Sequence, residues 1–500
     1  MIPLAVSRAL LDAFHAEGVR YCHWKSSEHV LAGLAGETDL DILIDRAQAG
    51  LAQGILARTG FKRFAATVGM GYPAIEDYIA LDRATGTLLH CHTHYRLVAG
   101  ERHLKGLQLP WENQFLNTRV WDPDHQIFLV DPNLEFLTLL LRAAVKLQVS
   151  DLASQLLGRR YVRGGLVAEY EWLSSRVERP RVLELGRELL GPDVEQPLAE
   201  LIDLPLTTGG LLRFRRAARS ELDRFRTFGP VTSFALQGLR GLAWTVAGVN
   251  RKLLRSPRPL RRTIPSGGLV VAFLGSDGSG KSTLVREIGR TYASKIDVYR
   301  VYFGSGDGPA SLLRLPLRVA RRLYVRVVRG PRQGPRIGTV PASARTAKRG
   351  AAGLGRLLWG LSLAREKGRR LQSAWRARSL GMLVLADRFP QTQVLGFNDG
   401  PLLSDLQHSP GRIARWFASR EARAYEWANR YPPDLVIRLN VSPPVAVGRK
   451  PEMTLQEVTR RVQAVRSLTF GPGAKVVDLD ADRPLEEVVR EVKWTIWSAI

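Results

Sequence analysis

The sequence predicts an α/β protein with two globular parts, joined by a helical and strongly basic middle region. Three observations lead to this prediction. From Gly267 onward, short apolar runs alternate with helical patterns, which is typical of a parallel sheet with crossover helices. In residues 1–145, short strand patterns alternate with turns, which favours an α+β domain. Between the two, Leu, Arg and Glu recur at helical spacing.

The 500 residues therefore divide into three predicted regions. Residues 1–145 form the first domain, residues 146–262 the basic helical region, and residues 266–500 the last domain. The boundary before the last domain falls in residues 255–262, where prolines and arginines oppose regular structure. A linker is expected there.

Cysteine content and hydropathy favour a cytoplasmic protein. The two cysteines, Cys22 and Cys91, exclude a disulfide framework, and a reducing compartment is expected. Residues 1–18 carry Asp12 and Glu17 in a helical pattern, which differs from a secretory signal. No apolar run of about 18 residues is free of interruption, so no membrane span is predicted.

The net charge of +26 is concentrated in two segments. Residues 205–265 hold 13 Lys/Arg against 2 acidic residues, and residues 312–378 hold 18 against 1. Such segments attract nucleic acid, phosphorylated substrates or acidic membrane surfaces. In residues 313–329, apolar and arginine side chains fall on opposite faces of a helix, which favours a peripheral position at the inner face of the membrane. A solvated basic face without a dedicated partner is the alternative.

A glycine-rich loop follows the first strand of the last domain. Residues 269–274 are an unbroken apolar run, the pattern of a buried parallel strand. Residues 275–282 have the sequence GSDGSGKS, which fits G-x-x-x-x-G-K-S/T, and a helical pattern begins at Leu284. In such a loop, backbone N–H groups surround phosphates at a helix N-terminus. The motif therefore predicts ATP and Mg²⁺ as ligands.

The residues of this loop have separate expected roles. Lys281 would reach the β- and γ-phosphates, and the Ser282 hydroxyl would hold Mg²⁺. The other loop residues would bind the phosphates of the nucleotide, and these are Gly275, Asp277, Gly278, Ser279, Gly280 and Thr283. A fortuitous glycine-rich turn would lack the strand before it and the helix after it.

Residues 273–283 resemble the phosphate-binding loop (P-loop) of thymidylate kinases and their relatives. Three later segments are similar to segments of that family in the same order: residues 380–389, residues 433–441, and residues 475–480 with the helix 485–497. The resemblance covers almost half of the chain. It implies a P-loop NTPase fold and a kinase that moves the γ-phosphoryl group of ATP to a phosphorylated acceptor. A homodimer is one of the assemblies left open.

The resemblance also assigns roles to four side chains. It places Asp387 near the metal and the reacting phosphates, and Arg388 on the acceptor phosphate. Asp277 stands where some members have an acid that contacts the sugar hydroxyl of the acceptor. Arg449 stands where a lid cation meets the transferring phosphoryl group. The alternatives are a structural ion pair for Asp387 and Arg388, and a solvated charge for Arg449.

The acceptor is left open by the sequence. Between Lys281 and Asp387 the chain is longer than in thymidylate kinases, and their tract for the thymine base is not recognisable. A nucleoside monophosphate, a sugar phosphate and a lipid-linked glycan intermediate at the membrane surface are therefore all open. A hypothesis of another class is a nucleotide-responsive ATPase that regulates the first domain or binds nucleic acid.

A second motif lies in the first domain. Asp39 and Asp41 are two residues apart in a strand pattern, so both carboxylates face one side and could share a divalent metal. Residues 21–27 supply a strand and a small-residue turn upstream. The combination resembles the nucleotidyltransferase superfamily, in which a Gly-Ser turn precedes an Asp-x-Asp strand. The resemblance implies metal binding by Asp39 and Asp41.

The third carboxylate of that superfamily is not evident. On one face of residues 87–95, three histidines stand where an acid is expected: His90, His92 and His94. Three such histidines could bind a metal, although strand histidines are more often hydrogen-bonded structural residues. Asp39 and Asp41 are expected beside the turn at residues 25–27 and within reach of these histidines. Whether this domain transfers nucleotides is left open.

Overall fold

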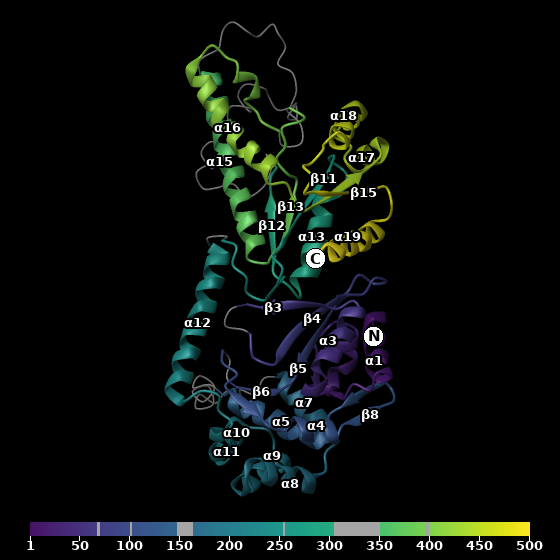
Figure 1. Ribbon diagram of the computed structural model, residues 1–500, viewed down its shortest axis with the longest axis vertical. Helices are drawn as coiled ribbons and strands as arrows, with labels where there is room; N and C mark the ends of the chain where they lie inside the picture. Colours follow the sequence, from purple (N-terminus) through teal and green to yellow (C-terminus); the bar gives the residue numbers. More distant parts are fainter. Residues whose placement is uncertain (68–70, 101–102, 148–163, 254–255, 305–350, 396–399) are drawn as a thin grey trace. The chain divides into compact units, whose positions relative to one another are not determined.

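The computed structural model describes residues 1–67, 71–100, 103–147, 164–253, 256–304, 351–395 and 400–500. The chain divides into two compact units: Met1–Leu254 with Leu260–Arg262, and Arg255–Pro259 with Thr263–Ile500. Each unit combines a sheet with helices (Figure 1), in agreement with the predicted α/β class. The three-region division of the sequence stays a prediction. The basic helix expected at residues 313–329 lies outside the described residues.

The first unit is built on an eight-stranded mixed sheet in the order β10-β3-β4-β5-β2-β1-β9-β8. β2 and β5 are parallel and pair Asp41 with His92, whereas β4 is antiparallel to β5 and pairs Asp77 with His92. Polar residues of three adjacent strands therefore meet across the sheet. The strands are β1 (Tyr21–His23), β2 (Leu40–Ile44), β3 (Lys62–Ala66), β4 (Ile75–Leu81), β5 (Leu88–His94), β8 (Val120–Asp122), β9 (Ile127–Leu129) and β10 (Arg262–Thr263).

Helices cover the two faces of this sheet with separate apolar cores. α1 (Ala5–Ala16) and α3 (Ala49–Arg58) lie side by side and bury Phe14 and Ile55 against β2, β4 and β5 (Figure 1). The second core includes Trp24 and the helix α5 (Pro132–Val145). α5 begins where Asp131 accepts hydrogen bonds from two backbone N–H groups and Pro132 fixes the first turn. α2 (Val30–Leu34) and α4 (Glu112–Asn117) are shorter.

The helices of the predicted middle region belong largely to the second core of the first unit. Tyr170, Val182 and Phe214 are buried in it together with Phe136 of α5. These helices are α7 (Gly164–Ser174), α8 (Arg179–Leu190), α9 (Glu195–Asp203), α10 (Thr208–Ala217) and α11 (Arg219–Arg224), and the long α12 (Pro230–Leu253) follows them. A small two-stranded sheet, β6 (Leu97–Ala99) and β7 (Leu107–Leu109), completes the unit.

The second unit is built on a five-stranded parallel sheet in the order β12-β13-β11-β14-β15. β11 pairs Phe273 with Asp387 of β13 on one side and Gly275 with Leu439 of β14 on the other. Because the strands are parallel, the segments that follow them meet at one edge of the sheet. The strands are β11 (Leu269–Gly275), β12 (Val298–Tyr302), β13 (Leu383–Asp387), β14 (Leu435–Asn440) and β15 (Lys475–Asp480).

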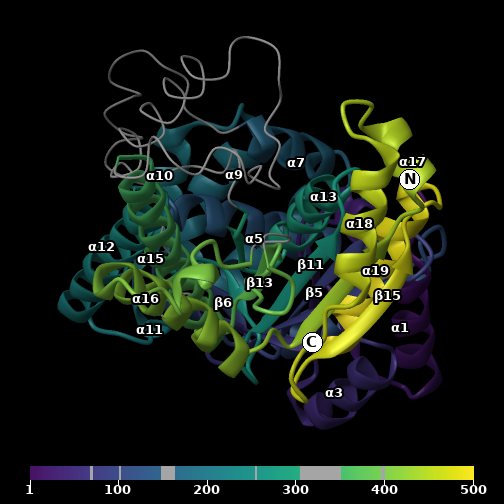
Figure 2. The same ribbon diagram turned by 90° about the horizontal axis from the view of Figure 1, so that it is seen from above.

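Within the described ranges of the second unit, six α-helices surround this sheet. α15 (Ala351–Ser379) and α16 (Arg412–Arg430) pack side by side, and α18 (Leu455–Arg466) and α19 (Leu485–Ala499) lie near β15 (Figure 2). α13 (Lys281–Ala293) follows β11 directly and contacts α19, and α17 (Pro443–Arg449) precedes α18. Among the helices of the described ranges, none combines the length and apolarity that crossing a bilayer requires.

Candidate functional site

The glycine-rich loop connects β11 to α13, and three of its glycines are required by geometry. Gly278 and Gly280 have φ angles of +83° and +82°, in the left-handed region that favours glycine. A Cβ on Gly278 would lie 2.6 Å from the carbonyl oxygen of Ala446, and one on Gly275 would lie 2.4 Å from Ser279 Oγ. The loop therefore winds tightly and ends at the first residue of α13.

Lys281 folds back over this loop. Its Nζ donates a hydrogen bond of 2.6 Å to the carbonyl oxygen of Ser276 and lies 3.4 Å from Ser279 Oγ. The side chain is buried, although an ammonium group is seldom buried without anionic or polar partners. The structure thus holds a cation inside the curve of the loop, where its charge would meet a phosphate.

Ser282 and Asp387 form the second feature of this site. Ser282 Oγ donates a hydrogen bond of 2.8 Å to Asp387 Oδ2 at the end of β13. The other carboxylate oxygen, Asp387 Oδ1, is buried without a hydrogen-bond partner among the described residues. An unpaired buried carboxylate oxygen is costly. Mg²⁺ prefers oxygen ligands such as hydroxyl and carboxylate oxygens and the phosphates of a substrate, so Ser282 and Asp387 fit that ion.

Asp277 of the loop forms ion pairs with two arginines. Arg388 Nη2 lies 2.8 Å from Asp277 Oδ1, and Arg461 of α18 pairs with Oδ2 of the same carboxylate. Burial alone would raise the pKa of Asp277, but Arg388, Lys281 and Arg461 hold that pKa below its ordinary value. Arg388 has a φ of +71°, an unusual backbone conformation for a residue with a side chain. The carboxylate thus holds two guanidinium groups beside the loop.

Arg449, at the end of α17, contacts two backbone carbonyl groups with its side chain, one of them in the loop. Its Nη1 donates to the carbonyl oxygen of Ala481 at 3.0 Å and lies 3.4 Å from the carbonyl oxygen of Gly278. A cavity of about 190 Å³ lies next to these contacts. Its lining combines polar and apolar groups, including Thr283, Leu284, Leu439, Arg449, Leu485 and Val488. A flat, largely apolar ligand group with polar edges would suit such a lining.

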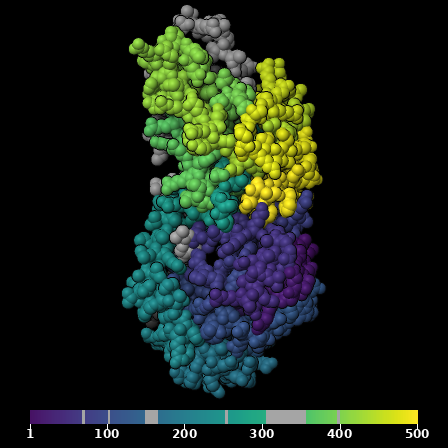
Figure 3. All heavy atoms as spheres, in the orientation of Figure 1, coloured from purple at the N-terminus to yellow at the C-terminus, as the bar shows by residue number. Residues whose placement is uncertain are grey.

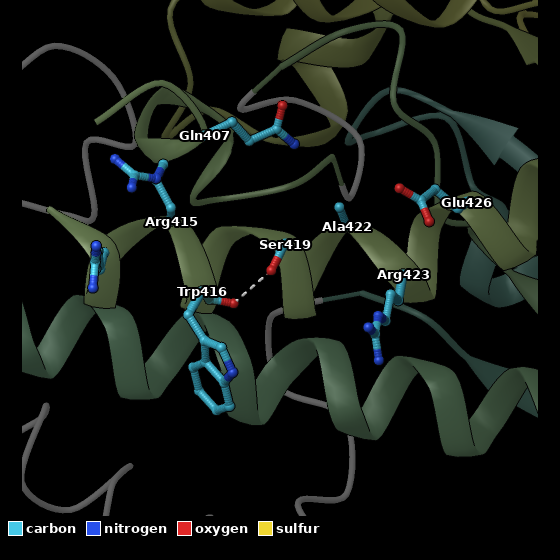
Figure 4. Close-up of a pocket in the computed structure, with 8 residues that line it drawn as sticks. Gln407, Arg415, Trp416, Ser419, Ala422, Arg423 and Glu426 are labelled. Carbon is cyan, nitrogen blue, oxygen red and sulfur yellow. Dashed lines mark hydrogen bonds between the residues drawn. The ribbon is translucent and has the colours of Figure 1, made fainter. Parts of the chain in front are cut away.

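A second hollow, of about 740 Å³, lies along α16 (Figure 4). Arg415, Trp416 and Arg423 line it with Glu426. Arg415 already donates hydrogen bonds to the carbonyl oxygens of Ser409 and Pro410. This arginine therefore fixes the chain that precedes α16. No residue predicted from the sequence as functional lines this hollow.

In the first unit, three aspartates and the histidines of β5 form a polar row that is largely buried and ends at the exposed Asp39. His90 lies between two carboxylates, with Nδ1 2.8 Å from Asp39 Oδ1 and Nε2 2.8 Å from Asp77 Oδ1. Arg262 Nε lies 2.7 Å from the same Asp77 oxygen. Asp39 is exposed, whereas His90 is fully buried. This part of the row is a chain of alternating acidic and basic groups.

Asp41 is the centre of the other part of the row. Its Oδ1 lies 2.9 Å from Lys25 Nζ, 3.0 Å from His92 Nδ1 and 3.4 Å from His94 Nε2. Burial alone would raise the pKa of Asp41, but Lys25 and the two imidazoles hold it well below the ordinary range. Burial lowers the pKa of both His92 and His94, so neutral imidazoles are favoured.

This donor set does not fit the magnesium site that the nucleotidyltransferase resemblance implies. Mg²⁺ demands oxygen ligands in an octahedral arrangement. The structure brings Asp41 beside the expected turn and both aspartates beside histidines, but it places an imidazole against each carboxylate and the Lys25 ammonium on Asp41. The nearest further carboxylate, Asp77, is bound to His90 and Arg262.

The turn beside Asp41 contacts a buried carboxyl group that the sequence analysis missed. Ser26 has a φ of +56°, and the backbone N–H of Ser27 donates to Glu135 Oε1 at 2.8 Å. Burial, with a smaller contribution from Glu169, raises the pKa of Glu135 to about 7. Glu135 lies in the apolar stretch of α5. A single acidic residue among leucines was the feature of the sequence that could have indicated a buried carboxyl group.

Comparison with known proteins finds similarity over less than half of this chain. No family model matches the chain. The uncharacterized ATP-binding protein YghR of Escherichia coli (strain K12) is 28% identical over 230 residues, which are 45% of this chain and 85% of that protein. The uncharacterized ATP-binding protein YghS of the same strain is 28% identical over 249 residues, or 46% of this chain and 93% of that protein.

Proposed function

We propose that the second unit binds ATP with Mg²⁺ and transfers the γ-phosphoryl group to a phosphorylated acceptor. The observation that carries this proposal is the hydrogen bond of 2.8 Å between Ser282 and Asp387, with Asp387 Oδ1 left unpaired beside the loop. The two similar E. coli proteins are named as ATP-binding, which supports the nucleotide part. The kinase part rests on the resemblance to thymidylate kinases and on the cations around Asp277.

In this proposal the loop and its neighbours bind different parts of the nucleotide and the metal. The backbone N–H groups at the start of α13 bind the phosphates, because the first turn of a helix directs its N–H groups outward at the positive end of the helix dipole. Lys281 exchanges its bond to the Ser276 carbonyl for phosphate oxygens. Ser282 and Asp387 would hold Mg²⁺, which neutralises charge on the phosphates when bound. The cavity beside Thr283 and Arg449 takes the base.

The acceptor side is formed by Arg388 and Arg461. Both guanidinium groups pair with Asp277, and Arg461 also pairs with Glu457. Guanidinium binds phosphate through paired hydrogen bonds, so an acceptor phosphate would compete with these carboxylates for the arginines. An acceptor phosphate would therefore take a place between the arginines and the γ-phosphate. Asp277 would then orient both arginines or accept a hydrogen bond from a hydroxyl of the acceptor.

α12 favours one class of acceptor over the others, namely a phosphorylated molecule at an acidic membrane surface. The outer side of this helix lies on the surface of the first unit (Figure 3), and its large apolar side chains are exposed: Val231, Phe234, Leu239, Leu242, Trp244, Val246 and Val249. Val231 is 83% and Phe234 is 80% exposed. Basic residues dominate the chain from Arg251 to Arg262. An apolar helix face next to basic residues suits the boundary of an anionic bilayer better than nucleic acid.

ATP binding and turnover test the proposal in two steps. Calorimetry of the full chain should give Mg²⁺-dependent ATP binding that Lys281→Ala weakens at least about 100-fold, while Lys475→Ala on the exposed edge strand β15 leaves it unchanged. Equal affinity in the wild type and Lys281→Ala would overturn the nucleotide site. ADP production should then rise with one member of a library of phosphorylated metabolites and lipids. ATP binding without any acceptor-dependent turnover would instead support a regulatory nucleotide switch.

A further inference from the structure

Three donor atoms in the first unit converge on one point. His92 Nδ1 lies 3.0 Å from Asp41 Oδ1, His94 Nε2 lies 3.4 Å from the same oxygen, and the two imidazole nitrogens are 3.3 Å apart. They form a nearly equilateral triangle. All three residues come from the paired strands β2 and β5, so the sheet itself fixes their spacing.

The size of this triangle matches one face of a tetrahedral metal site. Bonds of about 2.0–2.1 Å from Zn²⁺ to nitrogen and oxygen place neighbouring ligand atoms about 3.3–3.4 Å apart in a tetrahedron. Hydrogen bonds explain the triangle less well, because each imidazole nitrogen can donate or accept only once. Three mutual contacts among two nitrogens and one oxygen exceed what the available protons can bridge, and the Lys25 ammonium already donates to that oxygen.

The surroundings of the triangle favour metal binding as well. Asp41 and His94 are buried and His92 is nearly so, which limits competition from water. His92 Nε2, the nitrogen turned away from the triangle, lies 4.0 Å from Asp77 Oδ1. This distance exceeds that of a hydrogen bond, so Asp77 acts on the ring through its charge and not as the hydrogen-bonded outer partner that metal-bound histidines commonly have.

We propose that Asp41, His92 and His94 form a binding site for a transition-metal ion of the zinc class. The donor set of two imidazoles and one carboxylate suits Zn²⁺ and is a poor match for Mg²⁺. Three protein ligands leave a fourth position open, as in zinc sites that bind water or a substrate. Lys25 shares Asp41 with the metal and opposes it by charge. The site is separate from the ATP site and does not depend on the function proposed for the second unit.

The proposal is tested by Zn²⁺ and Co²⁺ titrations of the full chain after chelator treatment, without nucleotide. The wild type should bind one Zn²⁺ at this site, and Co²⁺ should give the visible absorption of a tetrahedral complex. His92→Gln removes one ligand and should weaken binding more than the roughly 10–100-fold that loss of an outer partner costs. His125→Gln is the matched control, because His125 pairs with Asp122 elsewhere in the same unit and should leave affinity unchanged.

A second variant keeps the test decisive if His92→Gln folds poorly. Lys25→Met removes the ammonium that competes for Asp41 while retaining the length of the side chain, and it should tighten Zn²⁺ binding about tenfold or more. If Lys25 and Asp41 form only a structural ion pair, neither the wild type nor Lys25→Met should bind zinc. The proposal is overturned if the wild type binds no Zn²⁺, or if His92→Gln and His125→Gln bind it equally.

Discussion

Arg388 and Asp277 are 111 residues apart in the sequence, yet Arg388 Nη2 lies 2.8 Å from Asp277 Oδ1. The pairing follows from the sheet, because β11 and β13 are adjacent parallel strands and each residue lies just beyond its strand. Arg388 reaches the carboxylate from a backbone conformation that costs about 1 kcal/mol for a residue with a Cβ. Position and strain together are typical of a residue held in place for function.

Arg388→Ala should therefore affect the acceptor rather than the nucleotide. We expect kcat/KM for the acceptor to fall about 10²–10³-fold, because the proposed cation on the acceptor phosphate is lost. The affinity for ATP measured by calorimetry should change by less than about threefold, since Arg388 is paired with Asp277 and not with Lys281 or Ser282. Arg290→Ala on the exposed side of α13 is the control. Lost ATP affinity with an unchanged acceptor KM would reverse the assignment.

Asp387→Asn distinguishes the contribution of Mg²⁺ to ATP affinity from that of the nucleotide contacts themselves. The amide oxygen can still accept the hydrogen bond from Ser282, so the local fold should survive. The negative charge is removed, and Mg²⁺ should no longer increase the affinity for ATP. Acceptor-dependent ADP production should drop at least about 100-fold.

The discriminating measurement for this variant is calorimetry in EDTA. Without metal, the wild-type carboxylate repels the phosphates, so Asp387→Asn should bind ATP as tightly as the wild type or more tightly. Asp478→Asn, at the exposed edge strand β15, should behave as the wild type in both buffers. A large loss of ATP affinity in EDTA would mean that Asp387 maintains the fold of the loop.

Glu135 should make the stability of the first unit depend on pH. Its pKa of about 7 in the folded protein lies above the ordinary value of 4.5, so the folded state binds more protons between these pH values. The stabilisation is complete below pH 4.5 and is lost as the pH rises through 7. Relative to Glu135→Gln, the wild type should lose on the order of 2 kcal/mol of unfolding free energy between pH 5 and pH 8.

Denaturant unfolding of the two proteins at both pH values measures this difference. Glutamine can still accept the hydrogen bond from the Ser27 backbone, so the comparison isolates the charge. Glu184→Gln on the exposed surface of α8 should show the same pH dependence as the wild type. A wild type that gains stability relative to Glu135→Gln on going to pH 8 would contradict the raised pKa.

The sequence was most informative where function depends on consecutive residues. The strand, loop and helix around residues 269–284 have local signatures, because glycines at φ > 0 and a continuous apolar strand leave few alternatives. Strand alternation likewise agreed with the position of Asp41, which lies in β2 and contacts His92. Asp39 lies just before β2 and is exposed, although it still reaches His90. The placement of Asp387 relied on family resemblance, since a single acid after a strand is common.

Residues brought together from distant segments were beyond the sequence analysis. Arg461 of α18 reaches Asp277 across 184 residues, and no spacing rule links α18 to the loop before α13. Lys25 was predicted as part of a turn, but its contact with Asp41 depends on the register of β1 against β2. The helices around Phe214 had evident apolar faces, yet periodicity cannot tell which surface such a face covers.

The exposed side of α12 leads to the last prediction, that the protein binds anionic membranes. Phe234→Ser and Leu242→Ser each remove a large apolar group from the exposed face, and burying such a group contributes about 1.5–3 kcal/mol. We therefore expect each change to weaken co-flotation with phosphatidylglycerol vesicles about tenfold or more. The wild type should bind phosphatidylcholine vesicles only weakly, because they carry no net charge. Its binding to phosphatidylglycerol vesicles should fall as salt is raised, since salt screens the basic residues after α12.

Leu455→Ser controls for a general loss of apolar surface, because Leu455 is also exposed but lies in the second unit, on α18. A gel-shift assay with single- and double-stranded nucleic acid tests the competing partner. Nucleic acid would bind through charge alone, so its affinity should depend on salt but not on Phe234. Binding to nucleic acid without vesicle binding would assign the basic residues to nucleic acid. Equal flotation of the wild type and Phe234→Ser would show that the apolar face of α12 does not enter the bilayer.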